Sequence, residues 1–273
     1  MKKRIAECLD RCRRQGRPAL IVYATVGCPD PASGELLIDR LIEAGADMIE
    51  LGVPFSDPMA DGPVIQKASQ MALAAGITFP QVLETAARLR SRHPETPLVL
   101  FSYYNVLFHY GLERLGAAIA SAGIDGVLVV DLPLEERDEL DPVLRENGID
   151  RIGLVSPATS PERAARIAAG GSGFIYCITV RGVTGVRSEL PRELAVELEQ
   201  ARKSCGLPVA AGFGISTPEM AVAVGRHADA VVVGSAMVSR VVAGEPARAV
   251  ELIGEIAAGL RAADSYSKSS QLK

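Results

Sequence analysis

The stretch Ala44-Gly45-Ala46-Asp47-Met48-Ile49-Glu50-Leu51-Gly52-Val53-Pro54-Phe55-Ser56-Asp57-Pro58-Met59-Ala60-Asp61-Gly62-Pro63 contains one complete structural unit of this chain. It begins at a glycine that can end a helix, continues as an apolar run over residues 48–51, and leaves that run at Gly52 for a loop with three prolines. A helix stop, a buried strand and a loop in this order are typical of one repeat of an α/β protein.

Two carboxylates of this stretch need a chemical explanation. Glu50 lies inside the apolar run, where an ionised side chain is costly unless something uses it. Asp61 lies in the loop, whose prolines Pro54, Pro58 and Pro63 restrict the backbone. A loop of this length in a compact domain is usually functional or disordered, and the prolines favour a function. The alternative is that Glu50 is a paired structural acid and Asp61 a turn residue.

The same unit recurs along the chain. Apolar runs that are continuous rather than alternating predict parallel strands buried on both faces, and we count eight: residues 20–26, 48–51, 98–101, 126–130, 152–155, 174–178, 209–211 and 230–233. Segments of helical period lie between them, at residues 34–44, 112–122, 135–147, 161–169, 192–204 and 218–225, and residues 63–93 have room for two helices. Glycines 45, 123 and 148 are expected to end helices.

Eight such units predict a single (β/α)8 TIM barrel over residues 1–264. Residues 2–15 form an extra amphipathic helix before it, and a long loop follows the second strand. Residues 265–273 are polar, and we expect a disordered tail.

Composition excludes several classes of function. The 273 residues are 48% hydrophobic with a net charge of −4, and the isoelectric point of about 5.6 leaves no basic footprint for nucleic acid or an anionic membrane. Without an apolar run long enough to span a bilayer, we expect a cytoplasmic protein. Cys8 and Cys12 are four apart on a predicted helix, but nothing nearby completes a metal site, so we interpret them as structural.

The last two units indicate a phosphate site. Gly212 and Gly214 follow the seventh predicted strand, and Gly234-Ser235 follow the eighth. Backbone amides at the start of a helix carry partial positive charge, and barrels often bind phosphate with the loops after these two strands. Ser216 and Glu219 have the spacing of a capping box for the helix between them. The alternative is that these glycines only make tight turns.

Other strand ends suggest how a substrate is held. The loop over residues 179–188 has glycines on either side of Val183-Thr184, which favours a lid. The alternative is that its arginines, Arg181 and Arg187, form a solvated charged face. Tyr23, Phe101, Tyr103 and Phe213 could hold a flat apolar group between the acids and the phosphate. Carboxylates without a metal or an imine suit proton transfer, which covers isomerisation, epimerisation and carbon-carbon cleavage of sugar phosphates.

Residues 50–66 as a whole resemble the signature of the tryptophan synthase α chain family. The resemblance continues through residues 25–29, 104–105, 131–133, 182–185, 212–215 and 234–235. It implies a lyase of tryptophan biosynthesis that cleaves indole-3-glycerol phosphate to indole and glyceraldehyde 3-phosphate by a retro-aldol reaction.

The resemblance also implies roles for single residues. Glu50 would be the general acid and base, and Asp61 would accept the indole N–H. Thr184 would orient Asp61. The phosphate would be held by Gly185, Gly214, Gly234 and Ser235, and the indole pocket would be lined by Tyr23, Phe101 and Tyr176.

A partner follows from the same resemblance. It implies a β chain that carries pyridoxal phosphate and receives the indole in an α2β2 heterotetramer, so this chain itself would need no cofactor. The loops with Pro54, Asp57, Pro58, Asn105 and Pro133 would face that partner. A free-standing indole-glycerol-phosphate lyase, another sugar-phosphate enzyme, and a non-catalytic activator of a β chain remain as alternatives.

Overall fold

A computed structural model of the chain describes residues 3–156, 158–178, 192–212 and 214–263. Within these residues one parallel sheet has the strand order β5-β4-β3-β2-β1-β9-β8-β7-β6. Its strands are β1 (Ala19–Thr25), β2 (Met48–Gly52), β3 (Leu98–Ser102), β4 (Gly126–Val129), β5 (Asp150–Arg151), β6 (Gly153–Val155), β7 (Ile175–Ile178), β8 (Val209–Gly212) and β9 (Ala230–Val233).

The nine strands occupy eight positions of a barrel. Only Ile152 separates β5 from β6; β5 pairs with β4, and β6 pairs with β7. The amide of Ile152 donates to the carbonyl of Val127 at 2.9 Å, which continues the ladder through the break. The two short strands are therefore one barrel strand, and the prediction of a TIM barrel with eight strands is confirmed.

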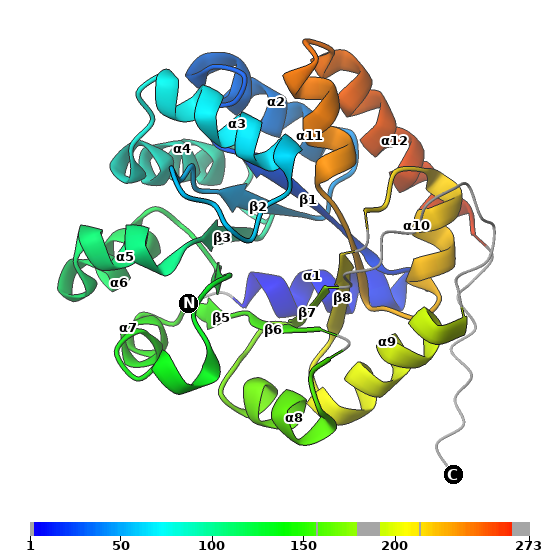
Figure 1. The fold of residues 1–273 in the computed structure, drawn as a ribbon. Helices are drawn as coiled ribbons and strands as arrows, with labels where there is room; N and C mark the ends of the chain where they lie inside the picture. The colour runs from blue at the N-terminus through cyan, green and yellow to red at the C-terminus, as the bar shows by residue number, and fades with distance from the viewer. Residues whose placement is uncertain (1–2, 157, 179–191, 213, 264–273) are drawn as a thin grey trace.

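Helices surround this sheet, as Figure 1 shows. They are α1 (Arg4–Arg14), α2 (Pro31–Glu43), α3 (Pro63–Ala74), α4 (Phe79–Arg92), α5 (Tyr104–Tyr110), α6 (Leu112–Ser121), the 3-10 turn η1 (Leu134–Glu136), α7 (Leu140–Glu146), α8 (Pro161–Ala169), α9 (Arg192–Cys205), α10 (Pro218–Gly225), α11 (Ser235–Val242) and α12 (Pro246–Ala262). Two helices do follow β2, as predicted. Glycines 45, 123 and 148 have φ of +117°, +76° and +67° and end helices α2, α6 and α7.

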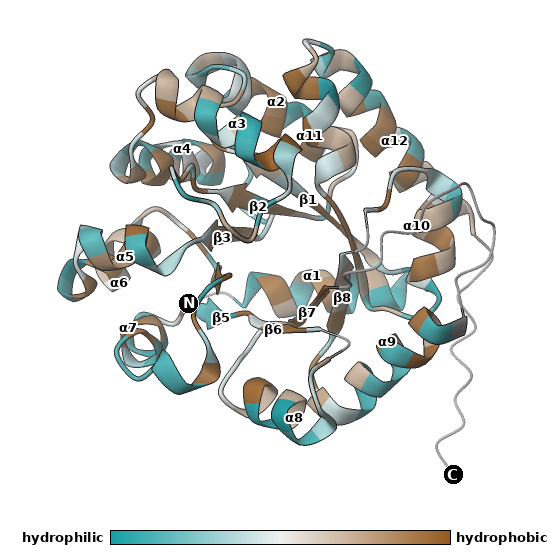
Figure 2. Ribbon diagram, in the orientation of Figure 1, coloured by the Kyte–Doolittle hydropathy of each residue, from teal (hydrophilic) through white to brown (hydrophobic). Residues whose placement is uncertain are grey.

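Helix α1 closes the barrel at the end where the strands begin. Its apolar stripe, Ile5, Cys8, Leu9 and Cys12, is buried in one cluster with inward-facing residues of the strands. The strand residues of that cluster are Ala19, Ile21, Met48, Val99, Leu128, Ile152, Phe174, Ala210, Ala230 and Val232. A second, larger cluster lies between the strands and the outer helices. Figure 2 shows the same division, with brown strands inside and teal on the outer helix surfaces.

Aspartates fasten the starts of neighbouring strands to each other. The Asp47 carboxylate accepts from the amide of Leu20 at 2.9 Å, and the Asp125 carboxylate accepts from the amide of Leu98 at 2.9 Å. Both acids are also paired with arginines, of which Arg17 reaches the two oxygens of Asp47 at 2.6 and 2.8 Å. These pairs hold the strand register at the end of the barrel opposite the strand carboxyl termini.

Two local predictions were wrong. Residues 135–147 do not form one helix: residues 134–136 make the 3-10 turn η1, and α7 begins only at Leu140, with Pro142 in its first turn, where a missing N–H is tolerated. Helix α10 is capped by Thr217, whose hydroxyl accepts from the amide of Met220 at 3.3 Å, and not by the expected Ser216 and Glu219. No residue range was predicted for helices α5, α11 and α12.

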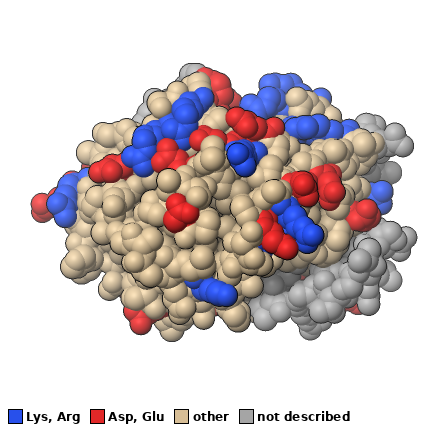
Figure 3. Space-filling model, turned by 90° about the horizontal axis from the view of Figure 1, so that it is seen from above, with Lys and Arg blue, Asp and Glu red and all other residues tan. Residues whose placement is uncertain are grey.

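The outer surface carries charges of both signs. In Figure 3 lysines and arginines lie beside aspartates and glutamates, so the face seen there has no extended patch of one charge. Examples of such pairing are Arg88 with Glu35 at 2.8 Å and Arg92 with Asp39 at 3.0 Å. No helix in the described part of the chain is long and apolar enough to cross a membrane.

Candidate active site

Glu50 lies in the interior of the barrel with no exposed surface. It is the middle residue of β2 and pairs in register with Tyr23 of β1 and Val99 of β3. Neither carboxylate oxygen has a hydrogen-bond partner among the described residues, although such a group is costly to bury unless it is neutral. Burial raises the pKa of Glu50 to about 8, so the free chain holds it as a carboxylic acid at neutral pH.

Asp61 lies in the loop between β2 and α3 and is held from two sides. Its carbonyl accepts from Nε2 of Gln66 at 2.9 Å. Its carboxylate accepts a hydrogen bond from the hydroxyl of Tyr103. Burial raises the pKa of Asp61 and the Tyr103 hydroxyl counteracts that rise, so Asp61 has the support for its charge that Glu50 lacks.

Tyr103 connects this loop to β3. Besides contacting Asp61, its hydroxyl accepts from the amide of Ala60 at 3.0 Å. Its ring packs on Phe55 with the centroids 5.0 Å apart. Tyr103 is therefore buried as a support of the loop, a role that the sequence did not indicate when it suggested contact with substrate.

Three aromatic rings line the barrel interior around Glu50. Phe101 of β3 meets Tyr23 of β1 edge to face at a centroid distance of 5.2 Å, and meets Tyr176 of β7 at 6.5 Å. Strands β3 and β7 are not neighbours, so these contacts cross the inside of the barrel. The charge of Glu50 raises the pKa of Tyr176, after the larger effect of burial, which places Glu50 in the same interior space.

Glycines make room for two of these rings. A Cβ built on Gly52 would lie 2.2 Å from the hydroxyl oxygen of Tyr23, and one built on Gly212 would lie 2.4 Å from that of Tyr176. The hydroxyl of each tyrosine thus lies near the carboxyl end of a neighbouring strand, in the space that a side chain on the glycine would fill. The chain needs glycine at both positions because any Cβ there would meet a tyrosine oxygen.

The expected phosphate end has the required backbone. Gly214 has φ of +67° and is exposed, with no atom of the other described residues within 4 Å of its Cβ position. Gly234 precedes α11, and Ser235, the first residue of that helix, is exposed. The helix N-terminus therefore presents free amides at the rim where the strands end. Thr184, Gly185 and Phe213 lie outside the described residues.

The residues expected to face a partner lie on the same rim. Asp57, Asn105 and Pro133 are exposed and Pro58 is partly so, on the loops or helices that follow β2, β3 and β4. Pro54 is an exception because it is buried, so it supports the loop without offering surface. Met59 and Phe108, which the sequence analysis did not single out, are 88% and 57% exposed on these segments.

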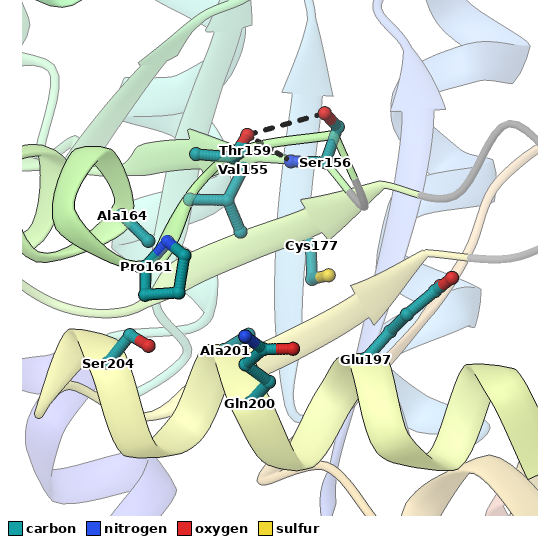
Figure 4. A pocket seen from close by; sticks show the side chains of 10 residues that line it. All are labelled: Val155, Ser156, Thr159, Pro161, Ala164, Cys177, Glu197, Gln200, Ala201 and Ser204. Atoms are coloured by element: carbon teal, nitrogen blue, oxygen red, sulfur yellow. Dashed lines mark hydrogen bonds between the residues drawn. The ribbon is translucent and has the colours of Figure 1, made fainter.

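Two other features of the structure, a cluster of two cysteines with an aspartate and a small pocket, are not part of the candidate active site. Cys8, Cys12 and Asp47 lie within 4.8 Å of one another, but the Asp47 carboxylate is bound by Arg17 and the Cys8 thiol donates to the Asp47 carbonyl at 3.3 Å. The pocket between α8 and α9 in Figure 4 has a volume of about 40 Å³, which is too small for an indole ring system.

Comparisons with known proteins agree with the geometry. The family model described as tryptophan synthase alpha chain matches residues 9–263. The tryptophan synthase alpha chain of Citrifermentans bemidjiense is 46% identical over 258 residues, which cover 94% of this chain and 96% of the relative. That of Chloroflexus aurantiacus is 46% identical over 237 residues, covering 87% and 89%.

Solved structures give the same result. The alpha chain from Legionella pneumophila superimposes with a TM-score of 0.85 at 34% identity, covering 96% of this chain and 97% of that one. A tryptophan synthase structure from Mycobacterium tuberculosis gives 0.87 at 33% identity, with coverage of 94% and 98%. This chain, with a buried acid inside a barrel of the same fold, belongs to the tryptophan synthase alpha chain family.

Proposed function

We propose that Glu50 and Asp61 carry out the reaction of this family, the cleavage of indole-3-glycerol phosphate in tryptophan biosynthesis. The observation that carries the proposal is the pair of unlike carboxyl environments at one end of the barrel. Glu50 has no hydrogen-bond partner among the described residues and a pKa of about 8, whereas Asp61 has a hydroxyl donor. Two acids whose environments separate their protonation states can divide the work of proton transfer.

The steps of the reaction follow from the protonation states of Glu50 and Asp61. Neutral Glu50 donates its proton to C3 of the indole ring, and the carboxylate of Asp61 accepts the ring N–H and stabilises the positive charge of the indolenine. Ionised Glu50 then takes the proton of the glycerol hydroxyl next to the ring. The carbon-carbon bond breaks, its electron pair restores the indole, and the hydroxyl carbon becomes the aldehyde of glyceraldehyde 3-phosphate. Glu50 ends protonated, as it began.

Binding groups surround this pair. The rings of Tyr23, Phe101 and Tyr176 form an apolar interior that suits an indole. Gly214, Gly234 and Ser235 hold the phosphate through free amides and a hydroxyl, in the manner expected of a helix N-terminus. Gly185 joins this phosphate site and Thr184 orients Asp61.

The partner is a tryptophan synthase β chain, which the family relation implies. In this proposal the assembly is a cytoplasmic α2β2 heterotetramer, and pyridoxal phosphate belongs to the β chain. The exposed side chains of Asp57, Asn105 and Phe108 lie on the segments that follow β2 and β3 and supply contact surface.

Indole release from indole-3-glycerol phosphate, with and without added β chain, tests the proposal. A Glu50→Gln variant should lose turnover by at least about a thousandfold while still binding indole-3-propyl phosphate, a substrate analogue without hydroxyls. Glu113→Gln, the same change at an exposed position of α6, is the matched control and should keep the wild-type rate. Turnover that survives in Glu50→Gln would contradict the assignment.

A further inference from the structure

The hydroxyl of Tyr23 lies one layer above Glu50 in the barrel. Tyr23 and Glu50 are partners in the register of β1 and β2. Gly52 follows Glu50 by two residues, so it faces the same interior one step nearer the carboxyl end of the strand. Because a Cβ on Gly52 would lie 2.2 Å from the Tyr23 oxygen, that oxygen occupies the place of a side chain directly above Glu50.

The phenolic proton of Tyr23 has no acceptor among the residues that the structure describes. The hydroxyl of Thr25 donates to the Tyr23 oxygen at 3.4 Å, so Tyr23 is the acceptor in that bond. No acceptor for the Tyr23 proton lies within hydrogen-bond distance among the described residues. Tyr23 is only 7% exposed and Thr25 4%, so this donor is kept away from bulk solvent. A phenol can accept and donate at once, and its donor remains available.

Both carboxylates act on this phenol. Burial is the main cause that raises the pKa of Tyr23, and the charges of Asp61 and Glu50 add to it. The hydroxyl is therefore neutral and protonated at physiological pH, and it lies within electrostatic reach of both acids. A substrate that contacts both Glu50 and Asp61, as the proposed function requires, would come close to this donor.

We propose that the Tyr23 hydroxyl is a further catalytic group, which donates a hydrogen bond to the glycerol oxygen whose proton Glu50 removes. This inference rests on the proposed function. The indole N–H is a donor and faces Asp61, so the oxygen next to the breaking bond is the acceptor that a substrate presents beside Glu50. That oxygen gives its proton to Glu50 and accepts from Tyr23, and the two groups come from paired positions on adjacent strands.

The donor acts most strongly as the bond breaks. Negative charge gathers on the oxygen when its proton leaves, and a fixed donor in a site without bulk water stabilises that charge more than it stabilises the ground state. Loss of the donor should therefore lower kcat more than it changes KM.

Tyr23→Phe isolates the hydroxyl, because the ring and its edge-to-face contact with Phe101 remain. We expect kcat for indole-3-glycerol phosphate to fall about 10- to 100-fold, with KM within about threefold of wild type. The dissociation constant for indole-3-propyl phosphate, which lacks the hydroxyl, should stay within about twofold. Tyr110→Phe is the control: it removes the same atom from a tyrosine of α5 that packs on Phe79, and should change none of these constants.

A second variant tests the orientation of the phenol. Thr25→Val removes the donor to the Tyr23 oxygen and should lower kcat about threefold in the wild-type background, but should have no further effect in Tyr23→Phe, since groups that act through each other are not additive.

An unchanged kcat in Tyr23→Phe would overturn the inference. An equal loss of affinity for the analogue would also overturn it, because the hydroxyl would then act on packing and not on the substrate oxygen. These results are distinct from failure of the proposed function, in which the wild-type chain with its β chain releases no indole or Glu50→Gln remains active.

Discussion

At the scale of residues, Glu50 combines a buried position with the absence of any hydrogen-bond partner among the described residues. Its pKa of about 8 is a consequence of burial alone. A structural acid at such a place would be expected to have a cation or several donors, as Asp47 and Asp125 do. The contrast within one chain supports the proposal that Glu50 serves in proton transfer.

The pH dependence of the reaction should report this proton. The first step needs neutral Glu50, so kcat/KM should fall about tenfold for each pH unit above about 8. Measurement of indole release from pH 6 to 10 checks this, with the chain shown to be folded over that range. A tenfold fall for each pH unit already between pH 6 and 8 would mean that the essential acid has an ordinary pKa.

The same burial should destabilise the fold at high pH. The unfolded chain ionises Glu50 near its ordinary pKa of 4.5, while the folded chain keeps it neutral up to about 8, so stability falls with rising pH across that window. Glu50→Gln should therefore raise the free energy of unfolding at pH 8.5 by on the order of 3 kcal/mol, and have a much smaller effect at pH 4.5. Urea denaturation of both proteins at the two pH values measures this change in the free energy of unfolding. An equal change at both pH values would show that the raised pKa of Glu50 is not its cause.

At the scale of elements, the starts of the strands depend on buried aspartates. Asp125 accepts from the amide of Leu98 at 2.9 Å and from Arg4 at 2.9 Å, pairs with Arg90, and is 3% exposed at its side chain. Helix α1, helix α4 and strands β3 and β4 thus meet at one carboxylate. Such a group determines register as well as stability.

Asp125→Asn keeps the shape but leaves two arginines without their charge partner. We expect unfolding to become easier by about 3 kcal/mol, because a broken buried pair leaves uncompensated charge. Asp10→Asn is the control: its pair with Arg13 joins side chains that are 51% and 65% exposed, and should change stability by less than about 0.5 kcal/mol. An equal loss of stability in the two variants would contradict the claim that burial makes the Asp125 ion pairs important.

A helix or strand could be predicted from the sequence where the residues that stabilise it lie within it or next to it. Continuous apolar runs identified every barrel strand, because the side chains on both faces of such a strand are buried and therefore apolar. Helix α5 was missed because its cap is remote: the amide of Tyr104 donates at 2.8 Å to the carboxylate of Asp131, from the loop after the next strand. Nothing in the sequence next to Tyr104 signals that helix start.

The candidate site shows the same limit. Glu50 and Asp61 were identifiable because a charge in an apolar run and a loop rich in proline are local features. The support that Tyr103 gives to Asp61 and Ala60 joins β3 to the preceding loop, and a hydroxyl between distant positions leaves no trace in either segment. The approach of Tyr23 to Gly52 also exists only once the strands are paired.

At the scale of the whole molecule, the rim of the barrel that carries the acids also presents exposed apolar side chains. Phe108 is 57% exposed on α5, directly after the strand of Phe101. Exposed large apolar groups at one rim favour a protein partner there. Substrate cleavage and partner contact would then share the same loops.

Phe108→Asp should raise the dissociation constant for the β chain at least tenfold, because an apolar contact becomes a buried charge. Leu36→Asp is the control, since Leu36 is 51% exposed on α2, which follows β1 and is not one of the segments after β2, β3 and β4 that are expected to face the partner. Calorimetric titration of each variant with β chain measures the change. If Leu36→Asp weakened binding as much as Phe108→Asp, the contact surface would lie elsewhere.

The burial of α1 has a consequence for biosynthesis on the ribosome. This helix is translated before every strand, yet its apolar stripe is covered by residues as late as Ala230 and Val232. Ile5, Cys8 and Leu9 are therefore not completely covered until nearly the entire polypeptide has emerged. During that interval the nascent chain exposes a short apolar stripe of the kind that chaperones bind. The stripe becomes fully buried when the last strands pair and α1 closes the end of the barrel.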